Sequence, residues 1–195
     1  MDYPVIFMEP GLHENPEKLK DALQKMINQL SNVDFILLGY ALCGNGLIGL
    51  TSKNATLVLP QYHDCIAMLL GSNERYRANL GSEIGGLFLT GGWLKYFNPK
   101  QKFYEDWLPR FGHDKALKYG KRMLADYKRI ILVENESYDV DATFLEMREP
   151  AKFFGLEEHR MRGTLDVIRK LVKGEWDGNF QIVPPGRKTE LWDLV

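Results

Sequence analysis

The sequence has few cysteines, no long hydrophobic run and no excess of charge of either sign. Its 195 residues include two cysteines, and 25 Lys and Arg stand against 26 Asp and Glu. Two cysteines cannot build the disulfide framework of a small secreted domain. A balanced charge without long runs of one sign argues against nucleic acid or an anionic membrane as the partner.

No stretch approaches the length of a transmembrane helix, and the first residues, MDYPVIFMEP, lack the basic and apolar regions of a signal peptide. We therefore expect a soluble, cytoplasmic protein. Hydrophobic residues make up 45% of the chain, which is enough for a sizeable core. The length suits one compact domain or two small lobes.

Two short apolar runs predict the strands around which the fold is organised. Phe35–Tyr40 and Thr56–Leu59 are continuously apolar and rich in β-forming residues, which is typical of strands buried on both faces of a parallel sheet. The first run leads into Cys43–Gly46 (CGNG), and the second leads into His63–Cys65 (HDC). Ligands in open α/β sheets bind beyond the carboxyl ends of the strands, so we expect both loops to face one crevice.

The rest of the chain alternates between helix and strand patterns. Asn15 is a good N-cap and Pro16 suits the first position of an amphipathic helix. Glycines and aromatic residues crowd into positions 81–112, which we interpret as an irregular connector. The other expected strands are Val5–Met8, Arg129–Val133, Leu156–Met161 and Phe180–Val183, and the other expected helices are Ile66–Leu70, Lys115–Tyr127, Asp141–Phe154 and Leu165–Val172. Leu47–Leu50 is expected to begin a short second crossover.

These patterns predict a three-layer α/β protein with mostly parallel strands. Residues 4–65 and 129–186 both follow a β-α-β-α-β order, so the chain forms either one sheet or two small facing lobes, and the crossover rule does not choose between them. The expected division is a first α/β lobe at 1–80, an aromatic-rich connector at 81–114 and a second α/β lobe at 115–195.

Cys43, His63 and Cys65 are candidate ligands of zinc or another transition metal, because thiolates and neutral imidazole are preferred donors for such ions. His63 and Cys65 lie on one side of the chain only if their segment is extended. Asp64 either orients His63 or stays outside the ligand set. Two other interpretations remain open. The cysteines are packed core thiols, or Cys43 and His63 form a nucleophile and base, with Glu9 or Glu134 as the carboxylate.

The turn Gly44–Gly46 is a candidate small-ligand site, since glycine backbone can approach an anion closely. It lacks the spacing of a dinucleotide-binding motif and the Lys-Ser/Thr of a P-loop, so a plain tight turn is the alternative. Trp93 follows two glycines and is expected at a pocket rim. Arg187, just after the last strand, is a candidate contact for an anionic ligand.

Several blocks of sequence resemble one family. LGYALCGNGLIGL, LVLPQYHDCIAMLLGSNERY, LTGGWL and KLVKGEWDGNFQIVPPG are similar to the bacterial and archaeal proteins grouped as domain of unknown function 1638. The resemblance implies a Rossmann-like α/β fold, with Cys43–Gly46 and His63–Cys65 at the family's motif positions. Members often lie near genes of corrinoid-dependent methyl transfer, which implies one-carbon metabolism and a methyltransferase or corrinoid protein as partner.

The resemblance weakens at the start of the chain. Family members usually open with an extra strand that carries a cysteine before the segment equivalent to Val5, and this chain begins only a few residues ahead of Val5. A missing fourth thiolate favours a metal site with an open position over a closed structural site.

Overall fold

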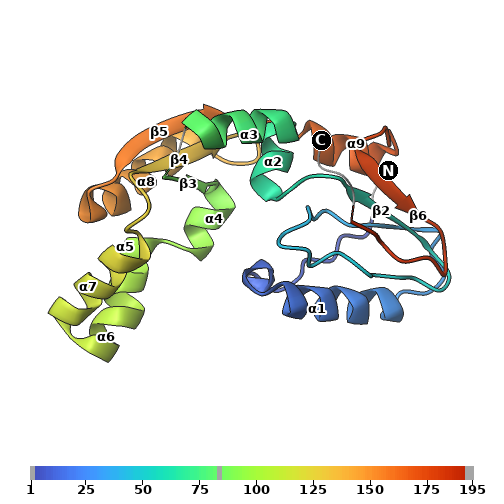
Figure 1. Ribbon diagram of the computed structural model, residues 1–195, viewed down its shortest axis with the longest axis horizontal. Helices are drawn as coiled ribbons and strands as arrows, with labels where there is room; N and C mark the ends of the chain where they lie inside the picture. The colour runs from blue at the N-terminus through green and yellow to red at the C-terminus, as the bar shows by residue number, and fades with distance from the viewer. Residues whose placement is uncertain (1–2, 83–84, 192–195) are drawn as a thin grey trace. The chain divides into compact units, whose positions relative to one another are not determined.

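The computed structural model describes residues 3–82 and 85–191 of the chain, which divides into two compact units. Residues 1–68 and 166–195 form unit 1, and residues 69–165 form unit 2. Each unit contains a three-stranded sheet and helices, so the protein belongs to the α/β class (Figure 1). This division differs from the expected one, because the last 30 residues return to unit 1 and the aromatic-rich stretch belongs to unit 2.

Unit 1 is built on a mixed sheet with the strand order β1-β2-β6. Strand β1 runs parallel to β2, with Phe35 opposite Thr56, and β6 runs antiparallel to β2, with Val183 opposite Leu57. The elements of unit 1 are the short 3-10 helix η1 (Leu12–Glu14), α1 (Pro16–Gln29), β1 (Phe35–Leu37), β2 (Thr56–Pro60), α9 (Asp166–Lys173) and β6 (Phe180–Val183). Helix α2 (Cys65–Leu70) crosses the boundary into unit 2.

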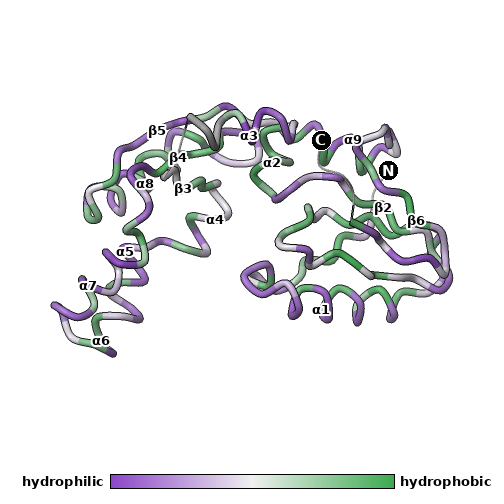
Figure 2. Tube along the Cα trace, viewed as in Figure 1, coloured by the Kyte–Doolittle hydropathy of each residue, from purple (hydrophilic) through white to green (hydrophobic). Residues whose placement is uncertain are grey.

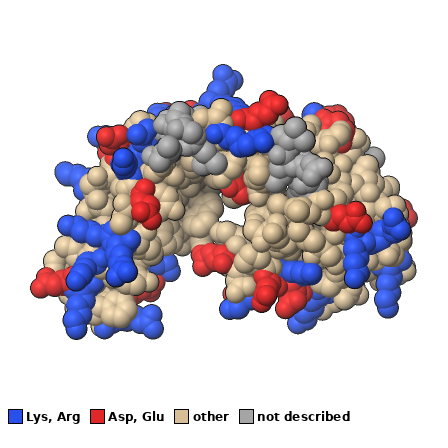
Figure 3. All heavy atoms as spheres, in the orientation of Figure 1, with Lys and Arg blue, Asp and Glu red and all other residues tan. Residues whose placement is uncertain are grey.

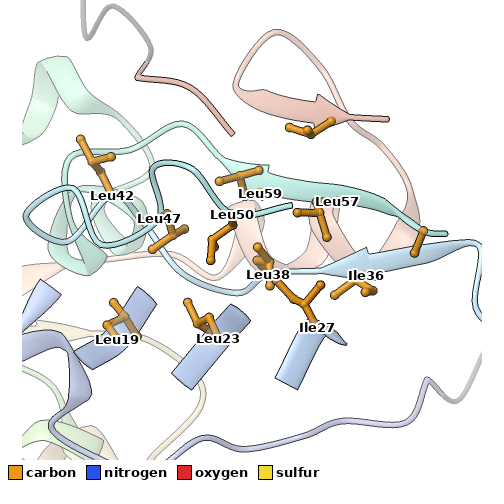
Figure 4. Packing of buried hydrophobic residues seen from close by; sticks show 12 residues of the cluster. Leu19, Leu23, Ile27, Ile36, Leu38, Leu42, Leu47, Leu50, Leu57 and Leu59 are labelled. Atoms are coloured by element: carbon orange, nitrogen blue, oxygen red, sulfur yellow. The ribbon is translucent and has the colours of Figure 1, made fainter. Parts of the chain in front are cut away.

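Helix α1 covers one face of this sheet. The side chain of Asn15 accepts a hydrogen bond from the Lys18 backbone N–H at 3.0 Å, and Pro16 occupies the first turn, as the sequence predicted. Leu19, Leu23 and Ile27 point from α1 into the core in Figure 4. They pack against a buried cluster from the strands and the following loop that includes Ile36, Leu38, Leu47, Leu50, Leu57 and Leu59.

Unit 2 is built on a parallel sheet with the strand order β3-β4-β5. Its core joins the central strand, through Ile130 and Leu132, to Met147 and Ala151 of α8. Figure 2 shows that β5 is hydrophilic, as expected for an edge strand. The elements of unit 2 are α3 (Asn73–Ser82), β3 (Gly86–Leu89), α4 (Gly91–Tyr96), α5 (Pro99–Lys102), the π-helix η2 (Phe103–Trp107), α6 (Leu108–Phe111), α7 (His113–Met123), β4 (Arg129–Glu134), α8 (Val140–Phe154) and β5 (Glu157–Arg162).

Several expected elements differ from the structure. Val5–Met8 is not a strand, and Val5 and Phe7 are exposed. The segment after Cys43 is a series of turns, and no crossover helix begins at Leu47. Asp139, not Asp141, caps α8. None of the helices in the described part of the chain is long and apolar enough to cross a membrane.

The expected irregular connector instead contains β3 and a series of short helices. Its aromatic residues do pack on one another, as predicted. Phe103 and Trp107 are buried with Ala116, against Phe153 and Phe154 of α8. Elements of four to six residues are too short to show a hydrophobic period, which is why the sequence pattern missed them.

Candidate functional site

The two motif loops meet beyond the carboxyl ends of β1 and β2. Hydrogen bonding between the two segments continues past β1, where the Leu38 N–H donates to the Val58 carbonyl at 2.8 Å. Further on, the Leu42 N–H donates to the Tyr62 carbonyl at 3.0 Å and the Cys43 N–H donates to the His63 carbonyl at 3.2 Å. Cys43 and His63 are therefore neighbours, as the strand-end argument predicted.

The CGNG loop has a left-handed backbone. Cys43, Gly44 and Asn45 have φ values of 43°, 67° and 73°, and the Gly46 N–H donates to the Cys43 carbonyl at 3.4 Å. Positive φ at both central residues is typical of a type I′ turn. A left-handed conformation costs a non-glycine residue such as Cys43 roughly 1–2 kcal/mol, so surrounding contacts must hold this loop in place.

The glycines of this loop allow it to pack closely on α1. A Cβ atom added to Gly46 would lie 3.0 Å from Leu19 Cδ2 and 3.2 Å from the Pro16 carbonyl, and one added to Gly44 would lie 3.1 Å from Pro16 Cγ. Gly46 is buried, whereas Gly44 and Asn45 are exposed. Only the Gly44–Asn45 part of the predicted ligand turn is therefore open to solvent.

The two thiols are electrostatic neighbours of each other and of Asp64. Burial raises the pKa of Cys43 to about 11, and the charge of Asp64 adds to the rise. Burial, followed by the charges of Cys43 and Asp64, raises the pKa of Cys65 to about 12. Backbone N–H groups oppose these shifts only in part. Both thiols are therefore protonated at neutral pH unless a cation lies beside them.

Asp64 and His63 have structural contacts of their own. Asp64 Oδ1 accepts a hydrogen bond from the Ala67 N–H at 2.8 Å and so caps α2. The Nε2 atom of His63 is buried. Within residues 3–82 and 85–191, no three His, Cys, Asp or Glu side chains form a group that could hold a metal ion. The residue types suit a thiophilic metal, but the Cys43, His63 and Cys65 set stays a prediction that requires side-chain rearrangement.

Tyr40 also belongs to this site, and sequence reasoning missed it. Burial raises its pKa and the charge of Cys43 adds to the rise, so the phenol lies near that thiol. The sequence feature that could have indicated Tyr40 is its position at the end of the first apolar run, three residues before Cys43. Tyr62, next to His63, is buried, and burial followed by the charge of Asp177 raises its pKa.

The segment around Thr189 forms hydrogen bonds with residues 47–51, which follow the CGNG loop. The Thr189 hydroxyl donates to the Leu47 carbonyl at 2.5 Å and accepts from the Leu50 N–H at 2.8 Å. The Gly49 N–H donates to the Thr189 carbonyl at 2.9 Å. The Thr51 hydroxyl donates to the Arg187 carbonyl at 2.7 Å, so Arg187 joins the loop through its backbone.

The remaining candidates are Trp93, Glu134 and Glu9, and each has its own local surroundings. Trp93 is in α4 of unit 2, in edge contact with the rings of Tyr96 and Phe97, and it packs against the unit 2 core. Glu134, at the end of β4, forms an ion pair with Arg160. Glu9 is exposed in the segment before η1. Trp93 and Glu134 thus belong to unit 2, whereas Glu9 and the two thiols belong to unit 1.

The model of one protein family, described as protein of unknown function (DUF1638), matches residues 7–172. The chain belongs to this family. The match includes the CGNG and HDC loops of DUF1638 but ends before β6 and the segment around Thr189, although the KLVKGEWDGNFQIVPPG block suggested that the resemblance extends further. Searches of curated proteins and of solved structures found no match.

Proposed function

We propose that this DUF1638 protein binds a thiophilic metal ion, alone or within a metallocofactor, through Cys43 and Cys65. The observation that supports the proposal is that two thiols lie near each other and near the carboxylate of Asp64. The two thiols come from the segments that follow the neighbouring strands β1 and β2. Buried groups that become anionic together are stable only when a cation offsets their charge. A bound metal ion supplies that charge and deprotonates its thiol ligands.

His63 is the further ligand that this proposal favours. Its backbone already bonds Cys43, so rotation of its side chain is enough to change what the ring contacts. Three protein ligands leave one position for a substrate, water or cofactor, and a metal with an open position can activate a thiol by lowering its pKa. Tyr40, beside Cys43, is then in reach of a ligand at that position.

The biological setting follows from the family resemblance. We infer a Rossmann-like arrangement, because both motif loops follow parallel strands β1 and β2 at their carboxyl ends. A methyltransferase or corrinoid protein is the proposed partner, with corrinoid as a cofactor that the partner carries. A cytoplasmic location agrees with two cysteines that are not disulfide-bonded.

Metal analysis of the purified protein without a tag tests the proposal. We expect about one equivalent of metal, and a thiolate charge-transfer absorption when Co²⁺ is added to the metal-free protein. Cys43→Ser and Cys65→Ser should each abolish that absorption. His63→Ala should weaken metal binding by at least about 10–100-fold, because that range applies to the loss of a residue that only supports a metal ligand and His63 is proposed as a ligand itself. His113→Ala is the matched control, because His113 is exposed and lies in unit 2.

The outcome that contradicts the proposal is specific. Metal far below one equivalent in the wild type, with no thiolate band after Co²⁺ is added, would remove the metal from the function. Equal metal affinity in the wild type and in Cys43→Ser would also contradict the proposal. A wild-type band that His63→Ala leaves unchanged would instead limit the ligand set to the two thiols and a residue other than His63.

A second candidate function is a metal-free site for a small anion at the Gly44–Asn45 turn. The turn is exposed, and Lys20 Nζ lies 3.0 Å from the position that a Cβ on Gly49 would occupy, so a cation stands beside the loop. Titration of the wild type with inorganic phosphate tests this site. Lys20→Gln should weaken binding, whereas Lys25→Gln, at an exposed position further along α1, should not. Equal phosphate binding by both variants would rule out this site.

A further inference from the structure

The helices from α5 to α7 carry a local excess of positive charge. Residues 95–128 contain nine Lys and Arg against four Asp and Glu, whereas the whole chain has 25 against 26. The rest of the sequence is therefore acidic, and the whole-chain balance conceals a basic region. Figure 3 shows Lys and Arg side chains gathered over this part of unit 2.

Ion pairs engage some of these bases. Lys100 pairs with Glu149, and Lys102 Nζ lies 3.1 Å from Asp106 Oδ2. The bases on α7 extend into solvent instead, where Lys115, Lys118 and Arg122 are exposed. We call the surface formed by these three residues the α7 basic face.

Packing fixes the rotation of α7, and with it the direction of this face. Ala116 and Gly120 are buried, and a Cβ on Gly120 would come within 2.7 Å of the Trp107 ring and 2.9 Å of the Phe154 ring. No larger residue fits there without a shift of aromatic rings. Positions 115, 118 and 122 follow helical spacing and lie on the opposite side of α7, so the helix holds their charges on one outer surface.

Two flat rings border the α7 basic face. Phe111 and Tyr119 are 44% and 49% exposed, and their ring centroids lie 5.7 Å apart. The Tyr119 ring also packs on the ring of Trp107, which is buried, with 5.3 Å between the ring centroids. Exposed aromatic rings among lysines provide both stacking surfaces and charge for a polyanion that carries bases.

We propose that the α7 basic face, with Phe111 and Tyr119, binds single-stranded nucleic acid. Lysine provides most of the charge in residues 95–128, and protein–protein interfaces are depleted in lysine. A membrane surface is disfavoured because the apolar side of α7 faces Trp107 and Phe154 rather than solvent. Phosphates contact the bases of the face, and the two rings stack on nucleobases without reading sequence.

Fluorescence anisotropy with labelled dT20 and rU20 at several salt concentrations tests this proposal. The variant is Lys115→Glu/Lys118→Glu/Arg122→Glu, and the control of equal charge change is Lys18→Glu/Lys25→Glu/Lys173→Glu, at exposed positions of unit 1. Loss of about three phosphate contacts should weaken binding at least about 50-fold at 50 mM salt and make the logarithmic salt slope shallower by about 2. The control should stay within about threefold of the wild type.

A second variant separates base stacking from charge. Phe111→Ala leaves every charge in place and should weaken oligonucleotide binding roughly fivefold or more, with no change in the salt slope. Circular dichroism melting should show that each variant is folded. Absence of wild-type binding to both oligonucleotides at 50 mM salt would overturn the proposal. So would equal losses in the two triple variants, or binding to polyglutamate as tight as to dT20, which would assign the face to an acidic protein.

Discussion

Thr189 bonds both Leu47 and Leu50 through one buried hydroxyl. The hydroxyl oxygen lies 2.5 Å from the Leu47 carbonyl and 2.8 Å from the Leu50 N–H, and Thr189 is 2% exposed. One side chain thus pairs two backbone groups of the segment that follows the CGNG turn. Since buried backbone groups need partners, Thr189 fixes the position of this loop although it is 139 residues away in sequence from Leu50.

Removal of this hydroxyl should destabilise unit 1. Thr189→Val keeps the shape of the side chain but removes the hydrogen-bond partner of the Leu47 carbonyl and the Leu50 N–H. This should lower the free energy of unfolding by about 1–3 kcal/mol. Thr189→Ser keeps the hydroxyl and should cost about 1 kcal/mol for the lost methyl group. Urea unfolding measures the loss of stability in both variants. Thr51→Val, which loses an exposed bond to Arg187, is the control, and a loss as large as that of Thr189→Val would contradict this role.

A side chain at Gly46 should disturb the contact between the loop and α1. Gly46→Val places atoms against Leu19 and the Pro16 carbonyl, where a Cβ alone already lies at 3.0 and 3.2 Å. Overpacking of this kind costs typically about 1–3 kcal/mol. Gly178→Ala is the control, because nothing lies within 4 Å of a Cβ there. If Gly46→Val unfolds at the wild-type urea concentration, the loop is not packed on α1 as described.

The thiols of the metal-free protein should react slowly with iodoacetamide at neutral pH. With pKa values of about 11 for Cys43 and about 12 for Cys65, the reactive thiolate is scarce until the solution becomes strongly alkaline. Removal of a metal with a chelator is therefore not sufficient to make them react as fast as a free cysteine. Peptide mass spectrometry gives the rate at each residue, and a rate that levels off below pH 9 would contradict the buried environment.

The same shifts predict how stability depends on pH. The pKa of each thiol is higher in the folded protein than the reference value of 9.0, so folding favours the protonated form. Their contribution is therefore fully present below about pH 9 and is lost as pH rises toward 11 and 12. The free energy of unfolding of wild type should fall more steeply over this range than that of the Cys43→Ala/Cys65→Ala variant.

The ion pair between Lys170 and Asp177 should contribute little at neutral pH and nothing in acid. The Lys170 ammonium, 2.6 Å from Asp177 Oδ2, lowers the pKa of that carboxyl, helped by the Asn179 N–H. The contribution is present above the unfolded value near 3.8 and disappears as pH falls through the lower folded value. Asp177→Asn should lower the free energy of unfolding by only about 0.2–1 kcal/mol at pH 7, because solvent screens an exposed ion pair. Asp21→Asn, at an exposed position of α1, is the control for urea unfolding.

Local chemistry explains which elements the sequence predicted well. The cap at Asn15 with Pro16, and the apolar runs that became β1, β2, β4 and β6, carry their signals within a few residues. The direction of β6 has no such local signal, because its antiparallel pairing with β2 joins residues that are 120 to 126 positions apart in the sequence. Val5–Met8 has strand-forming residues but pairs with no strand in the described chain, so propensity alone misled the prediction.

The candidate site was predictable where strand order decides position. Two loops at the ends of adjacent parallel strands had to meet, which brought Cys43 next to His63. The role of Gly46 was not predictable, because sequence does not distinguish a glycine that admits a ligand from one that admits a helix. Tyr40 was missed because an aromatic residue at the end of an apolar run looks like core.

Unit 1 is assembled from both ends of the chain, and this affects the order of events during synthesis. The CGNG loop leaves the ribosome early, but the Thr189 hydroxyl that bonds Leu50 is 139 residues further along. At about 5–20 residues per second, the loop waits on the order of ten seconds for that partner. During this interval β2 also lacks its antiparallel neighbour β6, so the nascent chain exposes an unpaired strand edge that a chaperone can recognise.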